Sequence, residues 1–288
     1  ELFKIDMETQ KDAPQGDASL EGAEFTWKFY AGHYTADNLP SEPTKTWVTK
    51  TIAEKDSDGT IHYVSRLSDE YKVSGDSFYT QDGKNVLPLG TLTVEETKAP
   101  NGYLLDGAYM QANGSEEQIK GMYLTQITED GDIAVLSGSN QFSVSDEVIR
   151  GGVKIQKRDL ETSDTKGQGS ATLKDAEFEI ISLNDNAVLV EGKLYSKNEV
   201  VKTILTDIEG VASTSADLLP YGKYRIEESK APEGYLTNGA EPIEFEITED
   251  GKIVDLTGTD TSIYNQVKRG DLEGVKIGAG THQRLAGV

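Results

Sequence analysis

The sequence predicts an all-β protein built from tandem antiparallel β-sandwiches, and three observations lead to that fold class. Apolar residues alternate with polar ones along many short runs, and runs with helical periodicity are almost absent. Glycine is frequent, with 29 residues among 288, which suits a chain with many tight turns. The decapeptide that begins at Glu95 returns almost unchanged at Glu227, so the chain contains an internal repeat.

The composition fits a chain of two domains with an acidic surface. Its 288 residues are enough for two hydrophobic cores, and it contains no cysteine. The net charge of −22 disfavours nucleic acids and anionic membranes as partners, because both attract basic surfaces. An exported protein without disulfides needs another covalent staple or a well-packed core. No apolar run reaches the roughly 20 residues of a membrane span, and no signal peptide or sorting tail is recognisable, so we expect an internal piece of a longer chain.

In the first repeat, alternating residues predict strands on both sides of a less regular segment. Phe25, Trp27 and Phe29 alternate with polar residues and give the strongest strand pattern. Residues 31–85 are long for a loop, so we expect extra hairpins there or a short helix near residues 68–71. The expected strands, in order, cover residues 2–6, 20–30, 90–97, 119–127, 132–136 and 140–149.

The second repeat restarts the same pattern. In both repeats a lysine on the first strand precedes a leucine by the same interval, from 4 to 20 and from 157 to 173. A Thr-Glu-Asp-Gly turn, which begins at Thr128 and again at Thr248, is expected to close a hairpin in each repeat. The expected strands cover residues 152–159, 173–180, 200–207, 222–229, 242–247, 252–256 and 262–267.

The positions of the repeats predict the domain boundaries. We expect a first β-sandwich at residues 1–149, with an insertion at about residues 31–85, and a second at residues 150–269. Residues 270–288 are expected to be a linker and the start of a truncated third repeat. There Lys276 is followed by Ile-Gly instead of x-Asp, and the Leu-Ala-Gly-Val sequence at residues 285–288 resembles the next strand start.

Each repeat also places three polar residues in register with apolar residues of its strands. They are Lys4, Glu96 and Asp146 in the first repeat, and Lys157, Glu228 and Asn265 in the second. Because side chains alternate between the two faces of a strand, all six are expected to face the core. Burying a carboxylate or an ammonium group without a partner is costly, so these residues require an explanation.

Four motifs together carry a resemblance to a known family. They are an opening Lys-x-Asp, a Leu-x-Gly-Ala-x-Phe strand, the segment Tyr-x-Ile-x-Glu-x-x-Ala-Pro-x-Gly-Tyr, and a closing strand with Asn or Asp. With these motifs the chain resembles the Cna B-type, SpaA-like domains of Gram-positive surface adhesins and pilins. The resemblance covers both repeats and the tail, and it implies an Ig-like or prealbumin-like sandwich. The first repeat departs from the pattern by having Leu92 where the family has an aromatic residue.

The resemblance implies that lysine and Asn or Asp join spontaneously into an isopeptide bond, assisted by the glutamate. The expected bonds are Lys4–Asp146 and Lys157–Asn265, with Glu96 and Glu228 as proton shuttles. Burial lowers the pKa of a lysine and raises that of a glutamate, which favours the uncharged forms that the reaction needs. The alternative is a buried, hydrogen-bonded ion pair without a covalent bond. Each reaction occurs once, so no enzyme activity with turnover is expected.

The leading functional hypothesis is a structural stalk or shaft segment of a cell-wall-anchored, extracellular adhesin or pilin. Its expected partners are adjacent repeats of the parent chain, with host or matrix proteins and other pilin subunits as further candidates. A second hypothesis is a ligand-binding module that uses residues 31–85, where Tyr30, Tyr34, Trp47 and Tyr63 could form an exposed aromatic patch. No cofactor and no metal are expected, since the three histidines are scattered without ligand spacing.

Overall fold

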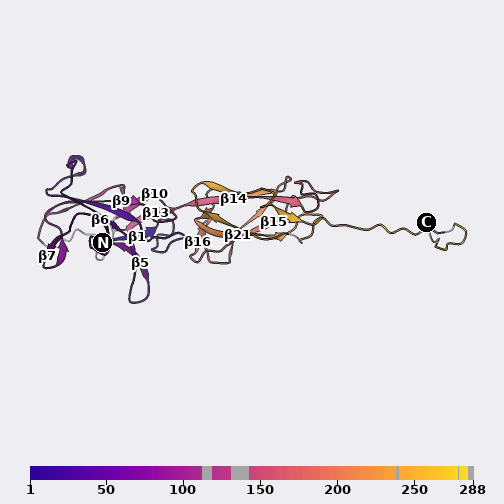
Figure 1. The fold of residues 1–288 in the computed structure, drawn as a ribbon, viewed down its shortest axis with the longest axis horizontal. Helices are drawn as coiled ribbons and strands as arrows, with labels where there is room; N and C mark the ends of the chain where they lie inside the picture. Colours follow the sequence, from indigo (N-terminus) through magenta and orange to yellow (C-terminus); the bar gives the residue numbers. More distant parts are fainter. Residues whose placement is uncertain (112–118, 131–142, 238–239, 278, 285–288) are drawn as a thin grey trace.

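The computed structural model describes residues 1–111, 119–130, 143–237, 240–277 and 279–284. Within these ranges the chain is built from strands, and the only helical segment is the 3-10 turn η1 (Ala36–Asn38). The strands fall into two groups, β1 to β13 and β14 to β24, which share no sheet. Figure 1 shows the two groups end to end along the long axis, with the C-terminal segment extending away from the second. We propose that these groups, here called the first and second units, are separate domains.

The first unit contains two packed sheets and one separate hairpin. One sheet has the order β11-β10-β13-β1-β5-β4, and the other has the order β12-β9-β2-β3-β6. The strands of the first sheet are β1 (Leu2–Asp6), β4 (Ile52–Lys55), β5 (Ile61–Ser65), β10 (Tyr103–Gln111), β11 (Ile119–Lys120) and β13 (Ser143–Val148). Those of the second sheet are β2 (Glu24–Tyr30), β3 (Lys45–Lys50), β6 (Lys72–Gly75), β9 (Gly90–Lys98) and β12 (Tyr123–Ile127). The hairpin pairs β7 (Tyr79–Gln81) with β8 (Lys84–Val86).

Residues 31–85, which the sequence suggested as an insertion, contribute strands to both sheets of the first unit. Strands β3 and β6 extend one sheet and β4 and β5 extend the other, so only the β7–β8 hairpin stands outside them. Extra hairpins are therefore present, whereas the helix expected at residues 68–71 is a turn. The expected exposed aromatic patch is wrong, because Tyr30 is 5% exposed and Trp47 is 0% exposed. Trp47 packs in the core and stacks on Phe78.

The second unit has the same two-sheet plan. In one sheet β14 (Arg150–Asp159) pairs with β19 (Val211–Ser213), β20 (Leu219–Pro220), β23 (Lys252–Leu256) and β24 (Ile263–Asn265). The other sheet has the order β18-β15-β21-β22, from β15 (Glu177–Ser182), β18 (Val200–Leu205), β21 (Gly222–Lys230) and β22 (Ile243–Ile247). A short hairpin joins β16 (Val188–Val190) to β17 (Lys193–Tyr195). The all-β sandwich architecture expected from the sequence is confirmed.

The turn at Thr248 does not close a hairpin, contrary to the expectation. Strand β22 pairs with β21, whereas β23 pairs with β14 in the facing sheet. The Thr-Glu-Asp-Gly segment is thus a corner that carries the chain from one sheet to the other. In the first unit, the expected strand at residues 132–136 lies outside the described residues, as does the segment 285–288 of the tail.

In each unit the first strand pairs in parallel with the last, which alternation along the sequence did not predict. In the first unit Asp6 lies opposite Asp146, and in the second Asp159 lies opposite Asn265. The lysine of each unit lies two residues before these aspartates on the same strand. Side chains two residues apart share a face of the sheet, so lysine and its expected partner both point into the core.

Candidate functional site

The second unit brings its three expected residues together between the two sheets. Lys157 lies on β14 and Asn265 lies on the neighbouring β24, while Glu228 reaches across from β21 in the facing sheet. The side chains of Lys157 and Glu228 are 0% and 1% exposed, and Asn265 is 0% exposed. The sandwich therefore places an amine, a carboxyl group and a carboxamide in one site closed to solvent.

Glu228 contacts both of the other groups through different oxygens. Its Oε1 lies 3.0 Å from Lys157 Nζ, and its Oε2 accepts a hydrogen bond of 2.6 Å from Asn265 Nδ2. Asn265 Nδ2 also donates to the carbonyl oxygen of Leu236, which fixes the amide plane. The carbonyl oxygen Oδ1 of Asn265 is buried without a hydrogen-bond partner. A carboxyl group between an amine and an amide nitrogen is well placed to carry a proton from one to the other.

The surroundings of Lys157 favour its neutral form. Burial lowers the pKa of Lys157 to about 8, although the neighbouring Glu228 acts in the opposite direction. The ring of Phe178, from β15, lies below the amine, with 5.7 Å between Nζ and the ring centroid. A fraction of this lysine is therefore uncharged near neutral pH, and an uncharged amine is a nucleophile.

The first unit assembles the equivalent site from β1, β9 and β13. Lys4 Nζ lies 2.9 Å from Glu96 Oε2 and forms an ion pair with Asp146. The side chains of Lys4 and Asp146 are 0% exposed and that of Glu96 is 1% exposed. The sequence-derived grouping of Lys4 with Glu96 and Asp146 thus corresponds to direct contacts in the core.

The two carboxyl groups of the first site both bind protons more tightly than in water. Burial raises the pKa of Glu96 to about 8, with the Lys4 amine opposing and Asp146 reinforcing the shift. Burial also raises the pKa of Asp146, against the effect of Lys4. A protonated carboxyl group is a far better acceptor of an amine nucleophile than a carboxylate, because its hydroxyl group can leave as water.

A break in strand pairing follows each glutamate. In the second unit Phe178 pairs with Glu228, but the preceding Glu177 pairs with Lys230, so one residue of β21 bulges out. The same shift follows Glu96 in the first unit. A bulge lets a strand change direction and re-aim a side chain, and it is frequent next to functional sites. Here it ends the strand just after the glutamate has been directed inward.

A second group of buried residues, which sequence reasoning missed, lies beside each site. In the first unit Asp6 accepts hydrogen bonds from Tyr103 OH at 2.9 Å and from Gln15 Nε2 at 3.0 Å. Tyr103 belongs to the repeated decapeptide, and Gln15 belongs to a Gln-Gly-x-Ala sequence that recurs at residue 168. That recurrence was the available signal. The contacts hold the end of β1, and hence Lys4, in place.

Glycine is required where the glutamate strand of the second unit begins. Gly222 has a φ of +147°, and a Cβ atom there would lie 2.2 Å from Asn184 Oδ1. The buried Asn184 in turn accepts a hydrogen bond of 2.7 Å from the backbone nitrogen of Lys223. This close approach sets where β21 starts relative to its neighbour β15, and therefore the depth at which Glu228 enters the core.

The described residues offer no other obvious chemistry. Among them, no group of three or more His, Cys, Asp or Glu residues could hold a metal ion. No helix in the described ranges is long and apolar enough to cross a membrane. The two buried triads are thus the principal candidates for a chemical role.

Comparison with known families agrees with this geometry. The family model described as "SpaA: Prealbumin-like fold domain" matches residues 152–262. The matched range lies within the second unit. It contains Lys157 and Glu228, and Asn265 follows it by three residues. No curated protein sequence matches the chain.

Several solved structures are similar to the chain at low identity. The Bacillus anthracis TIE protein is 19% identical, with a TM-score of 0.41; the match covers 93% of this chain and 56% of that protein. GBS52, the minor pilin of Streptococcus agalactiae, is 13% identical, with a TM-score of 0.32 and coverage of 96% and 99%. The shaft pilin spaA of Lactobacillus rhamnosus GG is 14% identical, with a TM-score of 0.30 and coverage of 94% and 98%.

Proposed function

We propose that the chain is a structural shaft or stalk segment of a Gram-positive surface adhesin or pilin, locked by two self-formed isopeptide bonds. The observation that carries the proposal is the pair of buried triads, each of which joins the first strand of a unit to its last. The SpaA prealbumin-like domain and the absence of cysteine support it, since a covalent lock other than a disulfide suits an exported shaft.

In the second unit the reaction joins Lys157 Nζ to Asn265 Cγ. The neutral amine attacks the carboxamide carbon, and the bond between Cγ and Nδ2 breaks. Glu228 takes one proton from the attacking nitrogen and delivers one to the departing nitrogen, so ammonia leaves and the carboxyl group is unchanged. The contacts of Glu228 to both nitrogens support this path. Fixing the reactants in the folded core supplies effective molarities of about 10⁵ M or more.

In the first unit the same attack by Lys4 on Asp146 Cγ releases water. The Asp146 hydroxyl group departs with a proton that Glu96 relays from the amine. The raised pKa values of Glu96 and Asp146 support this route, because both carboxyl groups hold a proton at neutral pH more readily than exposed ones. Each site reacts once and is consumed, so the chain modifies itself without acting as an enzyme with turnover.

The cellular setting follows from the same proposal. A shaft segment lies outside the cell, anchored to the wall through its parent chain, and its immediate partners are neighbouring repeats. Other pilin subunits or host proteins would contact the assembled fibre. The net charge of −22 suits a solvated surface and disfavours nucleic acids as partners.

The intact mass of the denatured chain tests the proposal. Two bonds reduce the calculated mass by one ammonia and one water. A deficit of ammonia alone would assign a bond to the second unit and leave Lys4 and Asp146 as a buried ion pair. The full calculated mass would overturn the cross-linking proposal, and peptide mapping across Lys157 and Asn265 identifies the joined residues.

One observation favours the ligand-binding alternative. A cleft of about 1020 Å³ opens between the β7–β8 hairpin and the sandwich of the first unit. Its walls include the aromatic residues Phe78 and Tyr79 and the half-exposed Leu89. Deleting the hairpin should abolish adhesion and leave both sandwiches folded if this cleft binds a ligand. Unchanged adhesion after the deletion would refute the alternative.

A further inference from the structure

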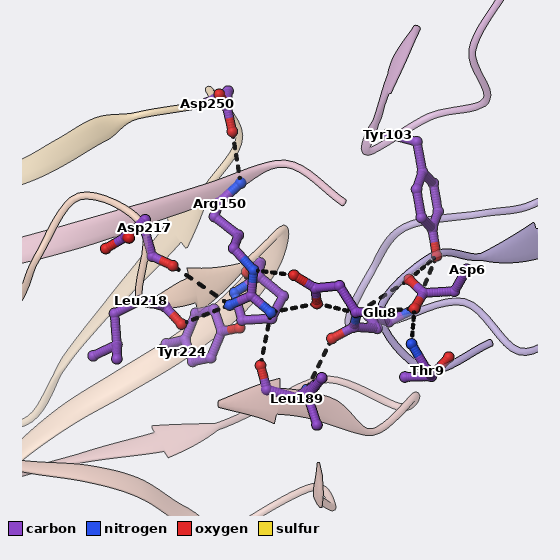
Figure 2. A network of polar contacts seen from close by, with 12 residues as sticks. Asp6, Glu8, Thr9, Tyr103, Arg150, Leu189, Asp217, Leu218, Tyr224 and Asp250 are labelled. Atoms are coloured by element: carbon purple, nitrogen blue, oxygen red, sulfur yellow. Dashed lines mark hydrogen bonds and ion pairs between the residues drawn. The ribbon is translucent and has the colours of Figure 1, made fainter. Parts of the chain in front are cut away.

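An arginine clamps the two units at their junction. Arg150, the first residue of β14, extends back to the first unit, where its Nε donates a hydrogen bond of 2.7 Å to Glu8 Oε1. Its guanidinium group also donates to the backbone oxygens of Leu189 and Leu218 in the second unit, each at 2.9 Å. Figure 2 shows this side chain between Glu8 on one side and Leu189 and Leu218 of the second unit on the other.

Beside the clamp, a corner of the first unit lies directly against the second. Gln15 Oε1 accepts a hydrogen bond of 2.8 Å from the backbone nitrogen of Leu189. The backbone nitrogen of Asp17 donates a hydrogen bond of 3.2 Å to the backbone carbonyl oxygen of Tyr221. Between them, Gly16 has a φ of +59°, and a Cβ atom there would lie 2.1 Å from the Tyr221 oxygen. The contact is therefore specific for glycine at this position.

The far end of the second unit carries the same set of residues. The first-unit set is Asp6, Glu8, Gln15, Tyr103 and Arg150, and the second-unit set is Asp159, Glu161, Gln168, Tyr235 and Arg269.

Their contacts agree closely. Gln168 Nε2 donates to both oxygens of Asp159 at 2.9 and 3.0 Å, and Tyr235 OH donates to Asp159 at 2.8 Å. Arg269 Nε donates to Glu161 Oε1 at 3.1 Å, as Arg150 does to Glu8. Arg269, four residues after Asn265, therefore forms the same ion pair as Arg150, four residues after Asp146.

The two ends differ in what covers them. Gln15 and Gly16 are buried, whereas the equivalent Gln168 is half-buried and Gly169 is exposed; Asp17 and the equivalent Ser170 are exposed in both cases. Gly169 has the same left-handed backbone, with a φ of +62°, but a Cβ atom there would meet nothing within 4 Å. The space that a Cβ atom would occupy is empty at Gly169, whereas at Gly16 the backbone of Tyr221 from the next unit fills it.

We propose that this end of the second unit is a docking face for a further module of the second unit's build, placed after it as the second unit is placed after the first. The expected occupant presents two features that the second unit presents at the junction. One is the backbone of the loop that leads into β16, and the other is a Leu-Pro-Tyr-Gly corner like that at residues 219–222. The Gly169–Ser170 backbone would receive them, together with Gln168 Oε1, which in the native chain accepts a hydrogen bond of 3.3 Å from Arg269.

A second copy of this chain does not provide that occupant. The matching surface of its second unit is already covered by its own first unit. The matching corner of its first unit, residues 87–90, reads Leu-Pro-Leu-Gly and has Leu89 in place of Tyr221. In addition, the β16–β17 hairpin follows β15 in the second unit and has no counterpart between β2 and β3 of the first unit. Leu189 of this hairpin is the residue that binds Gln15. The docking face therefore selects a module that has the hairpin and the Leu-Pro-Tyr-Gly corner of the second unit.

The described tail is compatible with this arrangement. Residues 270–277 are almost fully extended and exposed, and they lead away from the second unit (Figure 1). The sequence Val-Lys-Ile at residue 275 repeats that at residue 153, so the equivalent strand starts three residues later after Arg269 than after Arg150. Three extra residues add about 10 Å of reach, and Ser170 in place of Asp17 removes one ion pair, that with Lys223.

Hydrogen exchange on an extended chain tests the proposal. In the test protein, residues 1–274 are followed by a second copy of residues 153–269, so that Val153 takes the position of Val275. In the native chain the amides of residues 168–170 should exchange rapidly and those of residues 15–17 slowly. In the extended chain the amides of residues 168–170 are expected to slow by about tenfold or more.

One further protein and one folding control keep the test decisive. A second extended chain, in which residues 151–269 follow Arg269 directly, reproduces the spacing of the existing junction. Slow core amides in the added copy establish that it is folded. Exchange at residues 168–170 that stays as fast as in the native chain, in both extended proteins, overturns the proposal.

The substitution Gly169→Asn distinguishes docking from general stabilisation. Asparagine tolerates the left-handed conformation, so the variant should leave the Tm of the native chain unchanged. In the extended chain its side chain should block the approach of the added module and restore fast exchange at residues 168–170. The matched variant Gly16→Asn should open the existing junction, since its Cβ atom would collide with the Tyr221 oxygen. Slow exchange that persists in the extended Gly169→Asn chain would count against the docking face.

Discussion

Replacing Glu228 with glutamine separates the proton shuttle from the fold. Glutamine has nearly the shape of glutamate and can still meet Lys157 and Asn265, but it cannot accept a proton from one and pass it to the other. In the native chain both of these groups contact the Glu228 carboxyl group at 3.0 and 2.6 Å. We therefore expect Glu228→Gln to fold without forming the Lys157–Asn265 bond.

The size of the expected effect follows from the loop that the bond closes. The segment between Lys157 and Asn265 spans about 108 residues, and chain entropy assigns about 5 kcal/mol to a cross-link over such a loop. For a unit of this length, a loss of that size lowers the Tm of the second unit by roughly 20 °C. Loss of the carboxyl group opposite a buried amine adds to the destabilisation in the same direction.

Intact mass and thermal unfolding together measure this effect. The variant should keep the mass of one ammonia that the native chain loses, and its second unit should melt earlier. Glu227→Gln is the matched control, because Glu227 points to the opposite face, where it pairs with Arg225. A Glu228→Gln chain that loses ammonia as fast as the native chain would refute the shuttle.

Three other predictions concern the same two sites. Asp146→Asn should still form the bond in the first unit but release ammonia instead of water, which intact mass distinguishes; an unchanged loss of water would contradict the assignment. Because burial lowers the pKa of Lys157 to about 8, bond formation in newly folded chains should accelerate as the pH rises towards that value and level off above it; quenched samples followed by mass measure the rate, and a flat profile would argue against attack by a neutral amine. When the Asn265→Ala variant is stretched, its second unit should release roughly 370 Å of extra chain, at about 3.4 Å for each of the 108 residues that the bond would otherwise bypass. The native second unit should release none.

The composition of each site could be predicted from the sequence because its members lie in short, contiguous motifs. Lys157 and Glu228 each alternate with apolar residues of their own strand, so their burial follows from the period of a strand. Asn265 was grouped with them because it is the polar residue in register on the last strand, and the family resemblance then implied the bond. Their placement in one contact set, with Glu228 between the other two, depends on the facing of two sheets, which no local pattern encodes.

Other features depended on long-range pairing and were missed. The parallel pairing of β14 with β24 cannot be read from either strand, since alternation is the same for both directions. The corner at Thr248 was interpreted as a hairpin because its residues favour a tight turn, yet the flanking strands pair in different sheets. Trp47 was interpreted as a surface candidate because its segment lacks regular alternation, although β3 belongs to the core sheet.

The cross-links and the junction clamp lie on one path along the molecule. With the proposed bonds, tension that enters at Lys4 passes directly to Asp146 and reaches Arg150 four residues later; from Lys157 it passes to Asn265 and reaches Arg269 four residues later. The rest of each unit lies off this path and bears no load. In the first unit the clamp contacts the same path from the side, since Glu8 follows Lys4 by four residues and binds Arg150. The repetition of these spacings in both units argues that the bond and the clamp act together, one carrying tension through a unit and the other fixing how the next unit receives it.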